Sequence, residues 1–366
     1  MEGRKLSWKR AALAAGLGTV LLLQGCPKPD LAPLTPCVVS GFVRKVRITN
    51  IDAIDLLFVI DVSQSMIQEQ EAIKSQISRL VSILASGDTN GDGNQDFPPP
   101  PMGIHFAVAN TDLGSGRDSD TVFNCDRQGE DGNFITTSAP ARGPITTAEG
   151  TIPADPNTEC LDGYPPAERI QGGFVTYTPP ANGGVDQVQI NRIAKEIGCR
   201  AKVGVSGCGF EQQLEATLKA LTPSSSALTF TNSGVVTKGV GDGPVNNGFL
   251  RQDSLLAIIL VSDENDCSAA DNRLFAPPGE GPYGTNQGNL RCWQFGREQL
   301  GNDSPLHPVE RYVEGLLALR PDPDLVVFSA ISGIDEGVLL GTGQNFSQII
   351  AYTSMQDRPR PNVRTD

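Results

Sequence analysis

Three oxygen-bearing side chains stand at alternating positions directly after an apolar run of the chain. The run covers residues 55–60 (DLLFVI), and Asp61, Ser63 and Ser65 follow it. Such a run is typical of a strand buried on both faces of a parallel sheet, and ligands of open α/β sheets bind at the carboxyl ends of the strands. Carboxylate and hydroxyl oxygens suit Mg²⁺, Ca²⁺ and Mn²⁺. The pattern indicates a cation site; the alternative is a turn in which Ser63 and Ser65 cap a helix.

A second apolar run ends in the same way. Residues 254–262 (SLLAIILVS) have the composition of a buried strand, and Asp263 follows them directly. Glu264 and Asp266 crowd this position and add negative charge. The chain therefore carries two acidic motifs, each at the carboxyl end of an expected strand.

The other expected elements alternate between strands and helices. Strand-like runs lie at 103–110 and 325–331, and helical periodicity marks 66–85, 187–197, 211–221 and 306–319. This order predicts an α/β fold with an open, mainly parallel sheet flanked by helices. Irregular stretches near 112–185, 222–252 and 264–304 are expected to be loop insertions, and the first and the last of them carry cysteines expected to form disulfides.

The motif DLLFVIDVSQSM, with the later run closing in IILVSD, resembles the von Willebrand factor type A (vWA) domain. The resemblance covers residues 51–340 and implies a Rossmann-like sheet. It also implies a metal-ion-dependent adhesion site, in which Asp61, Ser63, Ser65 and Asp263 match the family's ligands at the ends of the two strands. A hydroxyl from a second loop normally completes that set.

The second loop departs from the family pattern of Gly-Gly-Thr. It reads GVSGCG over residues 204–209, so Ser206 is the predicted hydroxyl donor. Cys208 stands where a count from Leu214 would put the threonine, and a cystine sulfur is a poor ligand for a hard cation. Thr111 is another hydroxyl, but it belongs to the loop after the second strand.

The implied function is adhesion through the cation. A few carboxylates and hydroxyls leave a Mg²⁺ or Mn²⁺ ion with an open position, which an acidic side chain of a protein partner completes. The alternatives are a structural envelope protein with a vestigial metal site and, less favoured, a divalent-metal-dependent hydrolase. The sequence has neither a G-x-S-x-G elbow nor a phosphate-binding Gly-Lys-Ser/Thr loop, so we expect a binding protein and not an enzyme.

A second group of oxygen donors follows the first expected helix. Residues 88–96 (DTNGDGNQD) place oxygen ligands at positions 1, 3, 5 and 9 and glycine at position 6, as in a calcium loop of the EF-hand type. Position 12 is a proline instead of glutamate. The predicted site is thus a stand-alone Ca²⁺ loop, and the alternative is a solvated turn. Its donors are Asp88, Asn90, Asp92, Asn94 and Asp96.

The amino-terminal residues resemble a bacterial lipoprotein signal. Residues 1–25 combine a basic head with an apolar stretch too short to span a bilayer, and the tetrapeptide LQGC at 23–26 spans their end. Cys26 is therefore the expected lipidation site, and residues 26–50 are the expected tether leading into an edge strand. This predicts a lipid-anchored protein of the cell envelope, placed in the outer membrane on its periplasmic or surface face. The alternative is an ordinary signal peptide whose first mature cysteine forms a disulfide.

Charge and cysteine content fit an exported protein. The chain has 42 acidic and 29 basic residues, a net charge of −13, which argues against nucleic acid as a partner. In an oxidising compartment the cysteines form disulfides, and neighbours in sequence suggest the pairs Cys125–Cys160, Cys199–Cys208 and Cys267–Cys292. Cys37 remains odd. Residues 341–366 form an expected tail, and an alternative is that the carboxyl terminus is truncated.

Overall fold

A computed structural model describes residues 51–115, 125, 129–147, 150–232, 235–284 and 290–331. Its centre is a five-stranded sheet with the strand order β5-β2-β1-β8-β9. Strands β1 (Ile54–Ile60), β2 (Ile104–Asn110), β8 (Leu255–Val261) and β9 (Val326–Ile331) pair in parallel. Only β5 (Val175–Tyr177) runs antiparallel, at the edge beside β2. The predicted α/β class with a mainly parallel sheet is confirmed.

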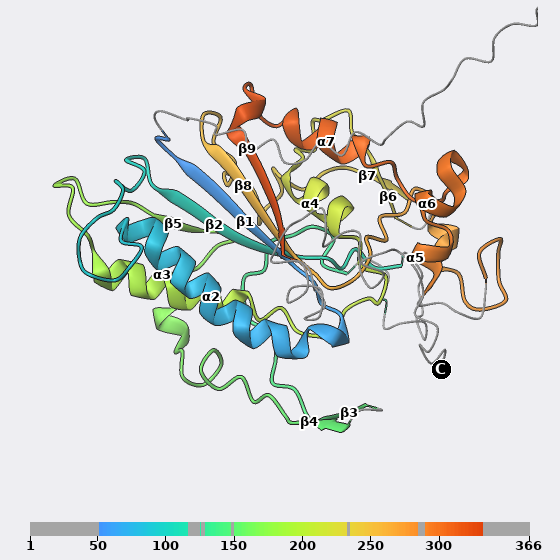
Figure 1. Cartoon of the computed structure of the whole chain (residues 1–366), viewed down its shortest axis with the longest axis horizontal. Coiled ribbons are helices and arrows are strands. Elements are labelled where there is room, and N and C mark those ends of the chain that lie inside the picture. The colour runs from blue at the N-terminus through green and yellow to red at the C-terminus, as the bar shows by residue number, and fades with distance from the viewer. Residues whose placement is uncertain are drawn as a thin grey trace, which may run out of the picture.

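Helices cover both faces of this sheet (Figure 1). On one face α2 (Ile67–Ser86) and α3 (Gln187–Arg200) lie side by side. Their apolar residues pack on Leu56, Phe58 and Ile60 of β1 and form one half of the core. On the other face α4 (Gln213–Leu221) and α7 (Glu310–Leu317) pack on the alternate strand residues, among them Leu57 and Val59. Because successive residues of a strand point to opposite faces, the side chains of β1 are buried on both faces of the sheet.

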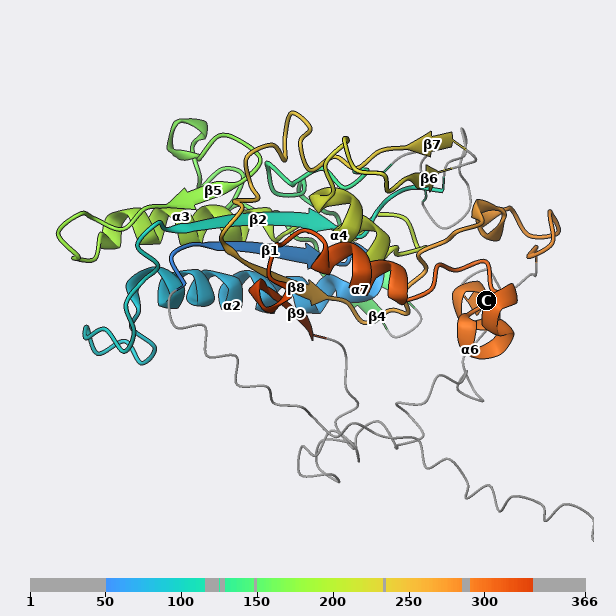
Figure 2. The same ribbon diagram turned by 90° about the horizontal axis from the view of Figure 1, so that it is seen from above.

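Two short hairpins and several single helical turns lie outside the central sheet and its four covering helices. Figure 2 shows the hairpin β6–β7 set apart from the sheet. The strands of the two hairpins are β3 (Ile145–Thr147), β4 (Gly150–Ile152), β6 (Phe230–Asn232) and β7 (Val235–Thr237). Single-turn α-helices α5 (Arg291–Gln294) and α6 (Arg297–Leu300) follow β8, and 3-10 turns lie at Gln64–Met66, Pro166–Glu168, Asn272–Phe275, Gly301–Asp303 and Pro323–Leu325.

A buried ion-pair network ties the amino ends of the strands together. Asp55 of β1 has no exposed surface, and its carboxylate accepts hydrogen bonds from Arg251 (2.8 Å) and Arg320 (3.1 Å). The hydroxyl of Ser254 donates to the same carboxylate. The network joins β1 to the segments that precede β8 and β9, and it lies at the end of the sheet opposite Asp61.

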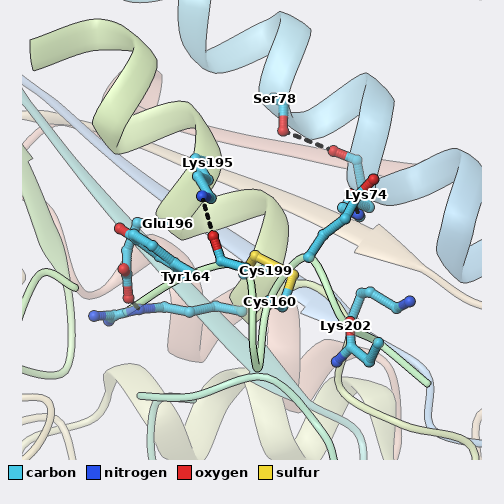
Figure 3. The surroundings of a disulfide bond; sticks show 12 residues. Lys74, Ser78, Cys160, Tyr164, Lys195, Glu196, Cys199 and Lys202 are labelled. Atoms are coloured by element: carbon cyan, nitrogen blue, oxygen red, sulfur yellow. Dashed lines mark hydrogen bonds and ion pairs between the residues drawn. A yellow bond between two sulfur atoms is a disulfide. The ribbon is translucent and has the colours of Figure 1, made fainter. Parts of the chain in front are cut away.

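The structure corrects two of the three expected disulfides. Cys125 pairs with Cys208 and Cys160 pairs with Cys199, in place of 125–160 and 199–208, whereas Cys267–Cys292 is confirmed. The expectation failed because pairing follows proximity in space and not order along the chain. Figure 3 shows the reason: Cys199 is at the end of α3, and the loop bearing Cys160 and Tyr164 folds back onto this helix beside Lys195.

Several expectations concern residues outside the described part of the chain. These are the signal peptide, the lipidation site Cys26, Cys37, the edge strand before residue 51, the last residues of the predicted domain (332–340) and the tail at 341–366. Among the described residues, none of the helices has the length and apolar character needed to cross a membrane.

Candidate functional site

Asp61 stands at the carboxyl edge of the sheet, directly after β1. Parallel pairing of β1 with β8 continues here, because the amide of Asp61 donates to Val261 (3.0 Å). The carboxylate is fully buried; it accepts the amide of Ser63 (2.7 Å) and the hydroxyl of Ser262 (2.6 Å). Burial raises the pKa of Asp61, with a smaller contribution from the charge of Asp263, although the hydrogen bonds from Ser262 and Ser63 oppose this rise.

The two acidic motifs of the sequence meet through a chain of side chains. The hydroxyl oxygens of Ser63 and Ser65 lie 2.8 Å apart, and Ser65 Oγ donates to Asp263 Oδ1 (3.0 Å). Ser65 and Asp263 are 198 residues apart in the sequence. Four of the five residues predicted as ligands, namely Asp61, Ser63, Ser65 and Asp263, are therefore gathered at one edge of the sheet.

The loop at 204–208 packs against the D-x-S-x-S loop. Gln70 of α2 bridges the two: its side-chain amide donates to the carbonyls of Asp61 (3.2 Å) and Gly204 (2.5 Å). The side-chain oxygen of Gln70 accepts the amide of Gly204 in return (3.2 Å). Gly207 approaches so closely that a Cβ there would lie 2.1 Å from Val62 Cγ2. Glycine at 207 thus permits the contact between the loops.

Ser206 itself is exposed, and no hydrogen bond joins its hydroxyl to the other predicted ligands among the described residues. Its role as a ligand stays a prediction. Cys208 is held in the disulfide with Cys125, and its amide donates to Asp112 (3.1 Å). The second loop therefore packs against the first through Gln70, while Ser206 forms no hydrogen bond with the other predicted ligands within the described residues.

A residue that sequence reasoning missed lies beside the site. Glu211 precedes α4 and is only 4 % exposed. Desolvation raises its pKa to about 9, and the negative charges of Asp61, Glu264 and Asp263 add to the rise. The sequence offered little reason to select Glu211 as a site residue, because an acidic residue at the start of a helix is usually explained by the helix dipole.

Two further carboxylates follow Asp263. Glu264 retains exposed surface, yet packing around its carboxyl group and the charges of Asp263 and Asp61 raise its pKa to about 7. Asp266 turns inward: it accepts the amide of Leu214 (2.9 Å) and the hydroxyl of Ser268 (2.8 Å), and desolvation raises its pKa to about 6. Asp266 thus anchors the start of α4, whereas Glu264 adds to the negative field of the site.

The oxygen donors of this region can be compared with the ligands that a divalent cation requires. Within the described part of the chain, no three His, Cys, Asp or Glu side chains form a group that would hold a metal ion without other donors. The residues in mutual contact are instead hydroxyls and single carboxylates, which are hard oxygen ligands. In addition, Thr111 follows β2, the strand next to β1, and its fully buried hydroxyl has no hydrogen-bond partner among the residues that the structure describes. The donor chemistry fits Mg²⁺ or Mn²⁺ provided that hydroxyls take part.

A polar cavity of about 530 Å³ flanks the site on the side of β2. The two loops form one wall through Val62 and residues 204–207. Lys202, which also lines the cavity, is neutralised by Glu71 (3.0 Å) and Asp155 (2.7 Å). The cavity thus adjoins the D-x-S-x-S loop at Val62.

The predicted calcium loop is an exposed turn after α2. Asp88 accepts the amides of Gly91 (2.7 Å) and Gly93 (2.8 Å), and these hydrogen bonds lower its pKa. Asp92 accepts the amide of Asn94 (2.8 Å), and Asp96 accepts the amide and hydroxyl of Thr89. Glycines 91 and 93 have positive φ, which lets the loop curl around Asp88. Calcium binding here stays a prediction.

Comparisons with known proteins identify no relative: no family model matches the sequence, and no curated protein matches it. Function must therefore be argued from the site.

Proposed function

We propose that this protein binds a protein partner through a divalent cation held at the carboxyl edge of its sheet. Asp61 and Asp263 would supply the negative charge, and Ser63 and Ser65 would supply neutral oxygens. The observation that carries the proposal is the hydrogen-bonded chain Ser63–Ser65–Asp263, which joins two sequence motifs at one point. The unpartnered hydroxyl of Thr111 supports it.

The partner is expected to present an aspartate or glutamate. Two carboxylates neutralise a divalent ion, and serine oxygens leave its charge unchanged. An ion held in this way keeps affinity for one more anionic ligand, and an acidic side chain is the anionic ligand that proteins offer. The cavity beside the D-x-S-x-S loop would receive residues next to that side chain.

The proposal extends to a family and a compartment. The sheet order, the D-x-S-x-S motif after β1 and the acidic residue after β8 support a vWA domain, with Mg²⁺ or Mn²⁺ as its cofactor. The sequence signal that ends at Cys26, together with three disulfides, supports a lipid-anchored envelope protein. A Ca²⁺ ion at residues 88–96 is a separate part of this proposal.

Binding is favoured over catalysis by the placement of the two histidines. His105 lies at the amino end of β2 near Asp55 and hydrogen-bonds the carbonyl of Phe249 (2.8 Å). His307 Nε2 lies 3.6 Å from Oε1 of Glu215, a residue of α4. Neither provides an acid or base beside Asp61, so a metal-dependent hydrolase would need chemistry from elsewhere. A structural protein with a vestigial site remains the second candidate, and loss of the Ser206 contact favours it.

The deciding experiment is capture of partners from an envelope extract in Mg²⁺, in Mn²⁺ and in EDTA. We expect a protein that is retained by wild type with either cation and is lost with EDTA or with Asp61→Ala. Asp52→Ala, which removes an exposed carboxylate before β1, is the matched control and should retain it. Equal capture by Asp61→Ala in Mg²⁺ would show that the cation site plays no part.

A further inference from the structure

We propose that Ser262 is a positioning residue of the proposed cation site, and that the side-chain amide of Gln213 governs it. This inference rests on the proposed function and concerns how Asp61 is held ready for the ion. Neither Ser262 nor Gln213 is among the ligands expected from the sequence. Both act through Asp61 and not through a contact of their own with the ion.

Ser262 joins the two acidic motifs from inside the protein. It follows β8 directly, it is only 7 % exposed, and its amide donates to the carbonyl of Ile331 in β9 (3.1 Å). Its hydroxyl donates to Oδ2 of Asp61 (2.6 Å), a residue 201 positions away. The same hydroxyl oxygen accepts the amide of Glu264 (3.1 Å). One side chain therefore holds the carboxylate of the first motif and the main chain of the loop that bears Asp263.

The carboxylate of Asp61 is fixed from both sides. Oδ1 accepts the amide of Ser63 (2.7 Å), and Oδ2 accepts the hydroxyl of Ser262. Because Asp61 has no exposed surface, a carboxylate oxygen that lost its donor would carry the full cost of desolvation. Groups that orient a metal ligand in this way typically contribute about 10- to 100-fold to metal affinity. Ser262 is thus expected to matter for cation binding without being a ligand.

This support depends on where the single proton of the Ser262 hydroxyl goes. A serine hydroxyl donates one hydrogen bond, and the carbonyl of Glu264, at 3.5 Å, is too far away to compete with Asp61. Gln213 is the first residue of α4 and is 1 % exposed. With its Nε2 placed 2.9 Å from the oxygen of Ser262, the amide donates to that hydroxyl and leaves its proton to Asp61.

The amide of Gln213 has a second orientation, in which its oxygen and nitrogen exchange places. Oε1 then accepts the hydroxyl of Ser262 (2.9 Å), and Nε2 donates to the carbonyl of Glu211 (2.7 Å) and to Oδ1 of Asp266 (3.1 Å). The second orientation satisfies the amide better, because the first directs its oxygen at those two acceptors. It also withdraws the proton of Ser262 from Asp61. Gln213 therefore opposes ion binding, and an ion at Asp61 requires the first orientation.

The test compares side chains of equal shape at position 262. Ser262→Thr keeps the hydroxyl and Ser262→Val replaces it by a methyl group, so the difference between them reports the hydroxyl alone. Calorimetry would measure the Mn²⁺ affinity of both variants, of Ser262→Ala, and of Gln213→Met with and without Ser262→Ala. Gln76→Met, on the exposed face of α2, is the matched control. Circular dichroism and thermal unfolding in EDTA show that each variant is folded.

Ser262→Thr should bind Mn²⁺ as wild type does, whereas Ser262→Val and Ser262→Ala should bind it at least about tenfold more weakly. Gln213→Met should bind Mn²⁺ several-fold more tightly, because the competing acceptor is gone. This gain should vanish in the double variant with Ser262→Ala, since Gln213 acts through that hydroxyl. Gln76→Met should match wild type.

Equal Mn²⁺ affinities of Ser262→Thr and Ser262→Val would overturn the inference and leave the proposed function standing. This comparison does not depend on the folding of Ser262→Ala. A wild-type affinity in Gln213→Met, or a gain that persists beside Ser262→Ala, would overturn the role assigned to Gln213. Absence of Mn²⁺ binding by wild type would instead overturn the proposed function.

Discussion

The hydroxyl of Ser65 donates to the carboxylate of Asp263 over 3.0 Å, although 198 residues separate them. The contact exists because β1 and β8 are parallel neighbours that end at the same edge. This hydrogen bond joins the D-x-S-x-S loop to the loop after β8. In the proposed site, the D-x-S-x-S loop would supply one set of oxygens and the loop after β8 would supply the second acid.

Removing either side of this contact should weaken cation binding. We expect Ser65→Ala and Asp263→Ala each to reduce Mn²⁺ affinity at least about tenfold, which corresponds to about 1.4 kcal/mol. Stability in EDTA should change little, because Ser65 and Asp263 are exposed. Calorimetry and thermal unfolding would measure the two effects. Ser75→Ala, on the exposed face of α2, is the control and should match wild type.

The stability of the metal-free protein should fall as pH rises. The folded-state pKa values of Glu211 and Glu264 are raised from 4.5 to about 9 and about 7. The folded protein therefore retains protons that the unfolded chain releases. The stability that these two groups contribute is fully present below about pH 4.5, and it is lost as the pH rises through about 7 for Glu264 and about 9 for Glu211. Thermal unfolding in EDTA between pH 5 and 9 would test this.

Two comparisons sharpen the pH experiment. Mn²⁺ should raise the melting temperature more at the upper end of this pH range, since protons compete with a cation for carboxylates such as Asp61, whose pKa is raised by burial, and Glu211→Gln should flatten the slope in EDTA. A melting temperature that rises with pH across this window in the metal-free protein would contradict the assigned environment of Glu211.

The network around Asp55 should be essential for folding. Asp55→Ala leaves the guanidinium groups of Arg251 and Arg320 without their shared anion, and Arg320 is almost fully buried. The expected loss is about 3–5 kcal/mol in the free energy of unfolding. Urea denaturation would measure it. Asp303→Ala, which removes an exposed carboxylate of the 3-10 turn Gly301–Asp303, is the control, and an equal loss in both variants would contradict a specific role for the network.

The disulfide pattern can be read directly by peptide mapping. Non-reducing digestion followed by mass spectrometry should recover Cys125 linked to Cys208 and Cys160 linked to Cys199. Replacing Cys160 and Cys199 together by serine should lower stability by about 2–4 kcal/mol, because the link closes a long loop of the unfolded chain. Recovery of a 125–160 peptide would show that proximity along the sequence decides the pairing after all.

The loop at 88–96 should bind Ca²⁺ independently of the site at Asp61. We expect Ca²⁺ to raise the melting temperature of Asp61→Ala but not of Asp92→Ala, because Asp92 is one of the proposed loop ligands. Asp88 and Asp96 already accept hydrogen bonds from the loop, so the preformed turn needs little rearrangement. If Asp92→Ala keeps the full Ca²⁺ effect, the loop is an ordinary solvated turn.

Much of the sheet could be predicted because burial on both faces leaves a strong local signal. The runs at 55–60, 254–262 and 325–331 correspond to β1, β8 and β9, and the helical periods correspond to α2, α3, α4 and α7. The antiparallel strand β5 escaped prediction. Its three residues are too few to show alternation, and only its pairing with β2 makes it a strand.

The sequence by itself determined the chemistry of the candidate site: the oxygen donors at Asp61, Ser63, Ser65 and Asp263, and their place at the ends of strands. Only the tertiary structure decided which other groups belong there. It joined Cys208 to Cys125, left Ser206 exposed and buried Glu211 among carboxylates. The physical reason is that spacing along a chain reports local periodicity, whereas burial and electrostatic environment arise from segments that meet only after folding.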